Sequence, residues 1–244
     1  MLYISASGAS QDLLATGVRS NNLANAQTTG FKAMLTQARS MPAFGDGLPT
    51  RVFAMTESPA NKMSGGAMVQ TDRDMDLAIQ GDGWFSVQDK NGGEAYTRAG
   101  SLQAGPDGIL QDAHGNSVLG DNGPIFLPLP LDNLNITSEG IVMITPQGAP
   151  ANVQEEIGRL KLVNPDTREL IRGQDGLFRQ ANGENAELDP AVQVRSGVLE
   201  GSNVNPIDEM MTVISLQRHY EMQVKLMKEA SELDQRGNQL LRII

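Results

Sequence analysis

The fold is decided by residues 205–244, NPIDEMMTVISLQRHYEMQVKLMKEASELDQRGNQLLRII, at the carboxyl end of the chain. Asn205 is a favourable N-cap, and Pro206 suits the first helical position. Asp208 and Glu209 place negative charge in the first turn, where it opposes the helix dipole. The sequence therefore predicts one long helix. At about 1.5 Å per residue this helix would span about 58 Å, which is longer than a small domain is wide.

Apolar side chains recur along this predicted helix in two stripes. The first stripe repeats every seven residues, with a break at Asp234, and the second runs beside it. The first holds Val213, Tyr220, Met227 and Leu241, and the second holds Leu226, Leu233 and Leu240. Residues spaced by seven return to the same helical face, so each stripe forms an apolar surface. A helix with two such surfaces must find packing partners elsewhere.

Residues 1–27 are also predicted to form a helix, because apolar residues recur at spacings of three and four. They are Leu2, Ala6, Ala9 and Leu13, with Leu14 and Val18 beside them. The face is poor in bulk, since Gly17 and several polar residues interrupt it. Such a stripe of small residues lets a second helix come close but buries too little area to hold alone. A frayed amino-terminal arm fits the isolated chain equally well.

Between the two ends, over about residues 70–205, the hydrophobic period changes to two. Met75, Leu77 and Ile79 alternate with polar residues, which is typical of half-buried strands. Six turn dipeptides punctuate this region: Asn91-Gly92, Asp107-Gly108, Asn122-Gly123, Glu139-Gly140, Asp175-Gly176 and Asn182-Gly183. Such dipeptides supply the positive φ of tight hairpins. The chain is therefore expected to be α+β, with a mainly antiparallel, hairpin-rich centre.

The predicted domain organisation has four parts. Residues 1–31 hold the amino-terminal helix, 32–70 an extended connector, 71–195 the central β domain, and 196–244 a strand or turn followed by the long helix. Within the connector, residues 41–70 are rich in Gly, Pro and Ser and show little periodicity. A connection of this length is unusual in a compact domain. It could be a flexible linker or a segment ordered only by neighbouring subunits.

Composition narrows the possible function classes. The 19 basic and 29 acidic residues give a net charge of −10, which argues against a nucleic-acid binder. Without cysteine the chain has no disulfide, thiol nucleophile or thiolate metal site, and its two histidines leave little scope for zinc. No basic start precedes an apolar run, so no cleaved signal peptide is expected. No window approaches the ~18–20 apolar residues of a membrane span.

No pattern for chemistry is complete, so we predict no enzyme, no catalytic residue, no cofactor and no metal. The Asp72-x-Asp74-x-Asp76 run lacks the glycine and glutamate that a calcium-binding EF-hand loop needs. Gly81-Asp82-Gly83 lacks the third glycine and the helix of a dinucleotide-binding motif. His114 and His219 are expected at the surface. An enzyme that uses scattered carboxylates on the β region stays as a weak alternative.

Both ends carry specific motifs. The stretch NNLANAQTTGFK at 21–32, and SGVLEGSNVNP at 196–206 followed by Glu209-Met210, resemble the amino- and carboxyl-terminal signatures of the flagellar rod and hook protein family. DLAIQGDGWF at 76–85 and YTRAG at 96–100 resemble its central region. The resemblance covers nearly the whole chain, and the chain length fits a rod protein with one β domain better than the longer hook protein.

The resemblance implies a structural subunit of the bacterial basal-body rod. It implies partners among other rod subunits and copies of the chain itself. Export would proceed uncleaved through the flagellar type III apparatus to the periplasmic rod, with no membrane insertion and no nucleic acid. The terminal helices would pair as a coiled-coil-like inner tube domain. Within the family, the chain most resembles a proximal rod subunit. A distal rod subunit and, in another class, a secreted β-domain binding module are the alternatives.

Fifteen residues are expected at the assembly interface. The helix-contact candidates are Leu13, Leu14, Val18, Leu23, Val213, Tyr220, Val224, Met227 and Leu241. Phe31 is a further candidate, and Asn22, Asn25, Gly30, Asn203 and Asn205 are expected to shape turns and helix ends. Packing within one chain is the competing interpretation for each apolar residue. One stripe of the long helix could pair the helices while the other meets a neighbour.

Overall fold

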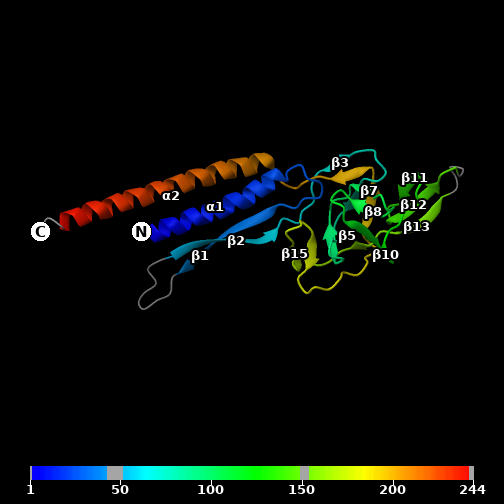
Figure 1. Cartoon of the computed structure of the whole chain (residues 1–244), viewed down its shortest axis with the longest axis horizontal. Helices are drawn as coiled ribbons and strands as arrows, with labels where there is room; N and C mark the ends of the chain where they lie inside the picture. Colours follow the sequence, from blue (N-terminus) through cyan, green and yellow to red (C-terminus); the bar gives the residue numbers. More distant parts are fainter. Residues whose placement is uncertain (1, 43–51, 149–153, 242–244) are drawn as a thin grey trace. The chain divides into compact units, whose positions relative to one another are not determined.

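The computed structural model describes residues 2–42, 52–148 and 154–241. The chain forms two compact units, drawn with their elements in Figure 1. The helical unit comprises residues 1–26, 33–62 and 204–244, and the β unit comprises residues 27–32 and 63–203. Each unit is therefore assembled from segments far apart in the sequence.

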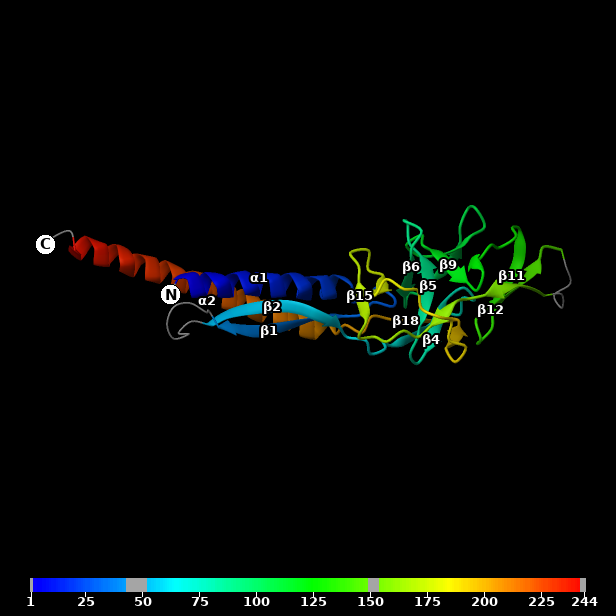
Figure 2. The same cartoon turned by 90° about the horizontal axis from the view of Figure 1, so that it is seen from below.

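The helical unit contains two helices and a hairpin. α1 (Leu2–Ala24) and α2 (Pro206–Leu241) lie side by side and antiparallel in both views (Figures 1 and 2). β1 (Met34–Pro42) and β2 (Val52–Asn61) pair antiparallel and pack against α1. The prediction that the two terminal helices pair is confirmed.

The helix pair uses one face of each helix. Half-buried residues of α2 recur at alternating spacings of three and four: Val213, Leu216, Tyr220, Gln223, Met227 and Ala230. This is the spacing of a helix that keeps one seam toward a partner. On α1, Ala9 is buried, and a Cβ at Gly8 would lie 3.2 Å from the Gln223 side-chain nitrogen. Small residues on α1 therefore let the helices approach closely. The side chain of Leu241, predicted to extend this stripe, lies outside the described residues.

The β unit contains sixteen strands among its described residues, and all the pairs are antiparallel. The largest sheet has the order β15-β16-β6-β5-β9-β8-β7, with β10 on β9 and β14 on β5. Its strands are β5 (Trp84–Gln88), β6 (Glu94–Thr97), β7 (Leu102–Ala104), β8 (Leu110–Asp112), β9 (Ser117–Gly120), β10 (Gly123–Pro124), β14 (Leu162–Val163), β15 (Leu170–Arg172) and β16 (Phe178–Gln180).

Three smaller sheets complete the unit. One is β11-β12-β13, and the other two are the pairs β17-β4 and β18-β3. Their strands are β3 (Met68–Gln70), β4 (Leu77–Gln80), β11 (Leu131–Ile136), β12 (Ile141–Pro146), β13 (Glu155–Arg159), β17 (Gln193–Ser196) and β18 (Val198–Glu200). The predicted α+β class with an antiparallel centre is confirmed.

The β unit has a closed core. Leu77, Ile79, Leu110 and Val142 are fully buried in its main hydrophobic cluster. A second cluster surrounds Trp84, whose ring centroid lies 4.7 Å from that of Phe178. The six glycines of the predicted turn dipeptides all have a positive φ. The alternation and the turn chemistry of the sequence therefore predict the antiparallel β character of this unit correctly.

The interpretation of residues 32–70 as an extended connector needs correction, since β1 and β2 form a paired hairpin there. The hydrophobic pattern of the sequence did not predict this hairpin, because the degree of burial along β1 does not match the hydrophobicity of its residues. Leu35 is exposed, while Thr36 is half-buried beside a register shift. Part of the predicted connector, residues 43–51, lies outside the described residues.

The bounds of the compact units also differ from the predicted domains. Residues 27–32 and 196–203 belong to the β unit and not with the terminal helices. β17 pairs with β4 and β18 pairs with β3, so the chain enters α2 directly from a strand and a short turn. Strands of three or four residues show too little alternation to be separated from a helix-flanking turn by pattern alone.

Candidate functional site

The two terminal signatures meet in space through two polar clusters, one in each unit. The helical cluster consists of Arg19, Asn22, Thr36, Glu209 and the backbone of Met34. The β cluster consists of Lys32, Arg98, Glu200 and the backbones of Ser64 and Gly66. Each cluster joins the beginning of the chain to its last quarter.

In the helical cluster, buried Glu209 in the first turn of α2 accepts hydrogen bonds from α1. Asn22 Nδ2 donates to Glu209 Oε1 at 3.0 Å, and Arg19 Nη1 donates to the same oxygen at 3.2 Å. Asn22 also exchanges two hydrogen bonds with the backbone of Met34, at 2.8 and 2.9 Å. Arg19 Nη2 donates to Thr36 Oγ1 at 3.0 Å. One cluster therefore fastens α1, α2 and β1 together.

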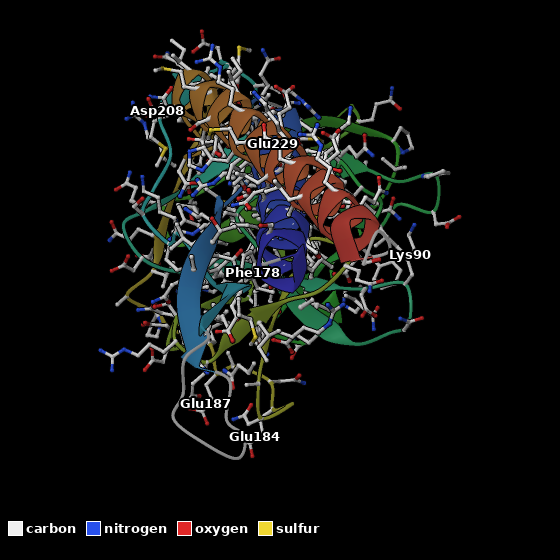
Figure 3. All side chains as sticks on the ribbon, turned by 90° about the vertical axis from the view of Figure 1, so that its left-hand side faces the viewer. Lys90, Phe178, Glu184, Glu187, Asp208 and Glu229 are labelled. Atoms are coloured by element: carbon white, nitrogen blue, oxygen red, sulfur yellow. The ribbon has the colours of Figure 1, made fainter. Side chains whose placement is uncertain are left out.

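The start of α2 is built as its sequence predicts. Asn205 Oδ1 accepts from the Ile207 backbone N–H at 3.1 Å, and Asn205 Nδ2 donates to Asp208 Oδ2 at 2.7 Å. This arrangement is an N-cap, and α2 begins at Pro206. The exposed side chains of Asp208 and, two-thirds along the helix, Glu229 are labelled in Figure 3.

In the β cluster, the carboxylate of Glu200 lies between two buried cations. Lys32 Nζ donates to Glu200 Oε1 at 2.7 Å, and Arg98 Nη1 donates to Oε2 at 2.9 Å. Lys32 and Arg98 are 1% and 5% exposed. The Gly66 N–H also donates to Oε1 at 3.0 Å, and Lys32 donates further to the Ser64 carbonyl at 3.1 Å. The two positive charges are thus shared by one fully buried carboxylate.

The environment keeps Glu200 ionised. Burial by itself would raise the pKa of this carboxyl group. The hydrogen bonds from Lys32 and Gly66 and the charge of Arg98 outweigh burial, so the pKa of Glu200 lies below its ordinary value. Arg98 also donates to the Gly81 carbonyl at 2.8 Å and lies over the Trp84 ring, 5.5 Å from its centroid. The cluster therefore reaches directly into the core.

Gly30 explains why the amino-terminal signature contains a glycine at this point. Its φ is +68°, and a Cβ there would lie 2.3 Å from the Ala99 backbone nitrogen. Its own N–H donates to the Glu200 carbonyl at 2.7 Å. Phe31 next to it is buried, with the Arg172 guanidinium 4.3 Å from its ring centroid. Any side chain at position 30 would force these backbones apart.

Fourteen of the fifteen residues predicted for the interface, all except Leu241, fall into three groups by their exposure. Those buried inside one chain are Asn22, Gly30 and Phe31. Those half-buried are Val18, Leu23, Asn25, Asn203, Val213, Tyr220 and Met227. Those exposed are Leu13, Leu14, Asn205 and Val224. Intrachain packing thus accounts for the first group, while Leu13, Leu14 and Val224 present apolar surface to the outside.

The sequence patterns did not single out the charged members of both clusters as site residues, namely Arg19, Lys32, Arg98, Glu200 and Glu209. Four of them stand inside or beside the terminal signatures, where charges are few. Charged residues in such charge-poor segments could therefore have been identified from the sequence as candidates for buried ion pairs. The pairing itself was not accessible, because Lys32 and Glu200 are 168 residues apart in the sequence.

A second feature is the outer groove of α2, a depression of about 880 Å³ along the helix. Its apolar floor is formed by Met211, Ile214 and Met222, of which Met211 is 65% exposed. Arg218 and Lys225 also line it. The second predicted stripe continues this exposed surface, since Leu226 and Leu233 are both more than half exposed. On α1, Leu13 and Leu14 are 55% and 56% exposed.

The described residues contain no candidate metal centre. In residues 2–42, 52–148 and 154–241 no three His, Asp or Glu side chains are grouped to hold a metal ion. His114 and His219 are both exposed. No helix within those residues has the length and apolarity to cross a bilayer.

Comparison with known proteins finds three matching family models. Residues 2–32 match "Flagella basal body rod protein", residues 78–144 match "Flagellar hook protein FlgE/F/G D1 domain", and residues 195–240 match "Flagellar basal body rod FlgEFG protein C-terminal". The two terminal matches contain the residues of the polar clusters, apart from Arg98 and the 34–66 segment.

Individual relatives align along most of the chain. The flagellar basal-body rod protein FlgF of Escherichia coli K12 is 41% identical over 246 residues, covering 98% of this chain and 97% of the relative. FlgF of Caulobacter vibrioides is 38% identical, covering 87% and 86%. FlgG of Buchnera aphidicola subsp. Schizaphis graminum is 31% identical, covering 98% of both.

Proposed function

The chain belongs to the flagellar basal-body rod protein family, and from this premise we propose that it polymerises through the outer faces of α1 and α2. It is a structural subunit of the basal-body rod and not an enzyme, and it assembles with other rod subunits.

The observation that carries the proposal is the exposed apolar surface of the helical unit. Leu13 and Leu14 on α1, and Met211, Ile214 and Met222 on α2, are all at least 45% exposed. Fully burying one such side chain contributes roughly 1.5–3 kcal/mol. Exposed apolar patches rimmed by polar residues are typical of interaction sites. These side chains gain partners only when another molecule covers them.

Charge supports the same proposal. The helical unit contains nine basic and nine acidic residues, whereas the β unit contains ten basic and twenty acidic residues. The whole net charge of −10 therefore belongs to the β unit. Neutral helical units can pack together without net repulsion, while the acidic β units favour contact with solvent.

The pairing we propose is heterologous: the Leu13–Leu14 face of one subunit lies in the outer groove of α2 of a neighbour. A rod requires a contact that repeats along a helix, which an interface between two different surfaces provides. A contact between two copies of the same surface would close into a dimer. Arg218, Lys225 and one acid, Glu221, line the groove, and the excess of positive charge complements Asp12, the acidic residue next to Leu13. The buried predicted residues, Asn22, Gly30 and Phe31 among them, act by shaping the subunit.

We further propose the proximal part of the rod as the place of this subunit, with a distal position as the alternative. Identity reaches 41% with a relative named FlgF and 31% with one named FlgG. Export without cleavage through the flagellar type III apparatus belongs to the same proposal, as does the role of the paired helices α1 and α2 as the inner tube domain.

The test places charge in the outer groove. The double variant Ile214→Glu, Met222→Glu is expected to remain folded as a monomer but to be lost from purified basal bodies, with swimming abolished. Gln217→Glu, exposed on the same helix and outside the groove, is the control and should assemble. Circular dichroism and Trp84 fluorescence check the fold. Normal incorporation of the double variant would refute the proposed interface.

A further inference from the structure

We infer that residues 193–203 are a closing segment, without which the rest of the β unit cannot reach its folded state. This segment contains β17, Gly197, β18 and the turn that leads to α2. A chain made or delivered from its amino end would therefore complete the β unit only when residue 203 becomes available. The inference stands on contacts within the β unit and does not depend on how subunits assemble.

The first observation is the position of β17. β17 pairs with β4 over its whole length, from Gln193 opposite Gln80 to Ser196 opposite Leu77. Among the described strands, β4 has β17 as its ladder partner, although Leu77, Ala78 and Ile79 of β4 are at most 1% exposed. Without the closing segment, backbone groups in the middle of the core lose their hydrogen-bond partners. Such buried unpaired groups are strongly disfavoured.

The second observation is electrostatic. Lys32 and Arg98 are buried, and the carboxylate that hydrogen-bonds to both belongs to Glu200, within the closing segment. Before the segment docks, two positive charges would have to be brought together in the interior without this partner. Burying unpaired like charges is unfavourable, so the amino-terminal and central segments cannot close over this site alone.

The third observation is how closely the segment is enclosed. A Cβ at Gly66 would lie 1.9 Å from the Gly201 carbonyl oxygen, and the Gly201 N–H donates to the Ala67 carbonyl at 2.8 Å. On the other side, the Gly30 N–H donates to the Glu200 carbonyl at 2.7 Å. The closing segment therefore runs between residues 30–32 and 64–67, which contact each other through Lys32 and Ser64. Within it, Val194, Val198 and Glu200 are buried in the unit.

The experiment cuts the folded full-length chain just before the segment. A protease recognition site is inserted in the exposed turn between Pro190 and Ala191, and the uncut protein must show the parent's Trp84 emission. Trp84 is the one tryptophan of the chain and is 2% exposed, so its emission reports on the β unit alone. After cutting, the two pieces are separated in denaturant and each is returned to buffer.

We expect the amino-terminal piece alone to show solvent-exposed Trp84 emission and fast amide exchange, and the carboxyl-terminal piece to restore the native signal on mixing. A carboxyl-terminal piece with Glu200→Gln should need about a hundredfold higher concentration, because the buried cations lose their counter-ion. The matched control is Glu229→Gln, an exposed acid on the same piece, which should act like the parent. Recovery of buried Trp84 by the amino-terminal piece alone, or equal potency of the Glu200→Gln piece, would overturn the inference.

Discussion

The helical unit and the β unit differ in where they leave their apolar surface and their charge. The β unit buries its large side chains in two clusters and carries the whole net charge at its surface. The helical unit is electrically neutral and leaves leucines, isoleucines and methionines exposed along both helices. This contrast is the basis of our proposal that the helical unit buries its exposed apolar side chains in contacts between molecules, whereas the β unit buries its own within one chain.

The largest expected effect comes from the buried charge of the β unit. Glu200→Ala should lower the free energy of unfolding of this unit by about 3–5 kcal/mol, because Lys32 and Arg98 stay buried without a counter-ion. Denaturant unfolding followed by Trp84 fluorescence measures the change. Glu187→Ala removes an exposed acid from the same unit, at the position labelled in Figure 3, and serves as the control. An equal effect of the two variants would contradict the role of the cluster.

A leucine-to-alanine substitution in each unit tests how the two units differ in the burial of their apolar side chains. Leu77→Ala creates a cavity in the core and should cost about 2–5 kcal/mol in unfolding free energy. Leu13→Ala removes a side chain that is already half exposed, so the monomer should change by about 0.5 kcal/mol or less. Leu13→Ala should instead weaken incorporation into basal bodies. A monomer destabilised equally by both variants would mean that the helical unit is as complete as the β unit.

A smaller effect is expected from the neutral member of the helical cluster. Asn22→Ala removes the amide that bonds to both Glu209 and Met34, and should destabilise the helical unit by about 1–3 kcal/mol. Thermal unfolding followed by circular dichroism reports on α1 and α2. Asn21→Ala changes an exposed neighbour on the same helix and provides the comparison. If the two variants melt alike, the cluster does not hold the helices together.

The smallest effect is a pH dependence in the β unit. Hydrogen bonds from Arg179 hold the pKa of Asp89 and of Asp175 below their ordinary values. Their contribution is complete above the unfolded pKa of about 3.9, and it is lost as the pH falls through the lower folded values. It should be about 1 kcal/mol or less, since Asp175 is largely open to solvent. Trp84-detected unfolding between neutral and acidic pH should lose this component in Arg179→Gln, and an unchanged profile in that variant would contradict it.

Local chemistry explains what could be predicted from the sequence. The start of α2 follows from the capping ability of Asn205, and the hairpin turns follow from glycines that need a positive φ. The seven-residue stripe identifies the face of α2 that meets α1, because helical periodicity depends on nearby residues alone. The exposed second stripe was anticipated on the same grounds.

What could not be predicted depends on contacts between distant residues. In the hairpin of β1 and β2, Leu35 is exposed and Thr36 is half-buried, which is the opposite of what their hydrophobicity predicts. Thr36 is covered because its hydroxyl accepts a hydrogen bond from Arg19 of α1, a contact that the sequence pattern does not contain. The charged residues of the terminal signatures are visible in the sequence, but their oppositely charged partners lie between 102 and 190 residues away. One sequence carries no record of such pairings.

Gly8 has no Cβ atom, and this absence affects how closely α1 can approach α2. With no side chain there, α1 lies close to Gln223, and an added methyl group would require that neighbour to give way by a few tenths of an ångström. A bulky residue would act as a wedge between the helices. Since every copy in an assembly carries the same residue, the displacement would recur at each repeat and accumulate along the polymer as an altered pitch.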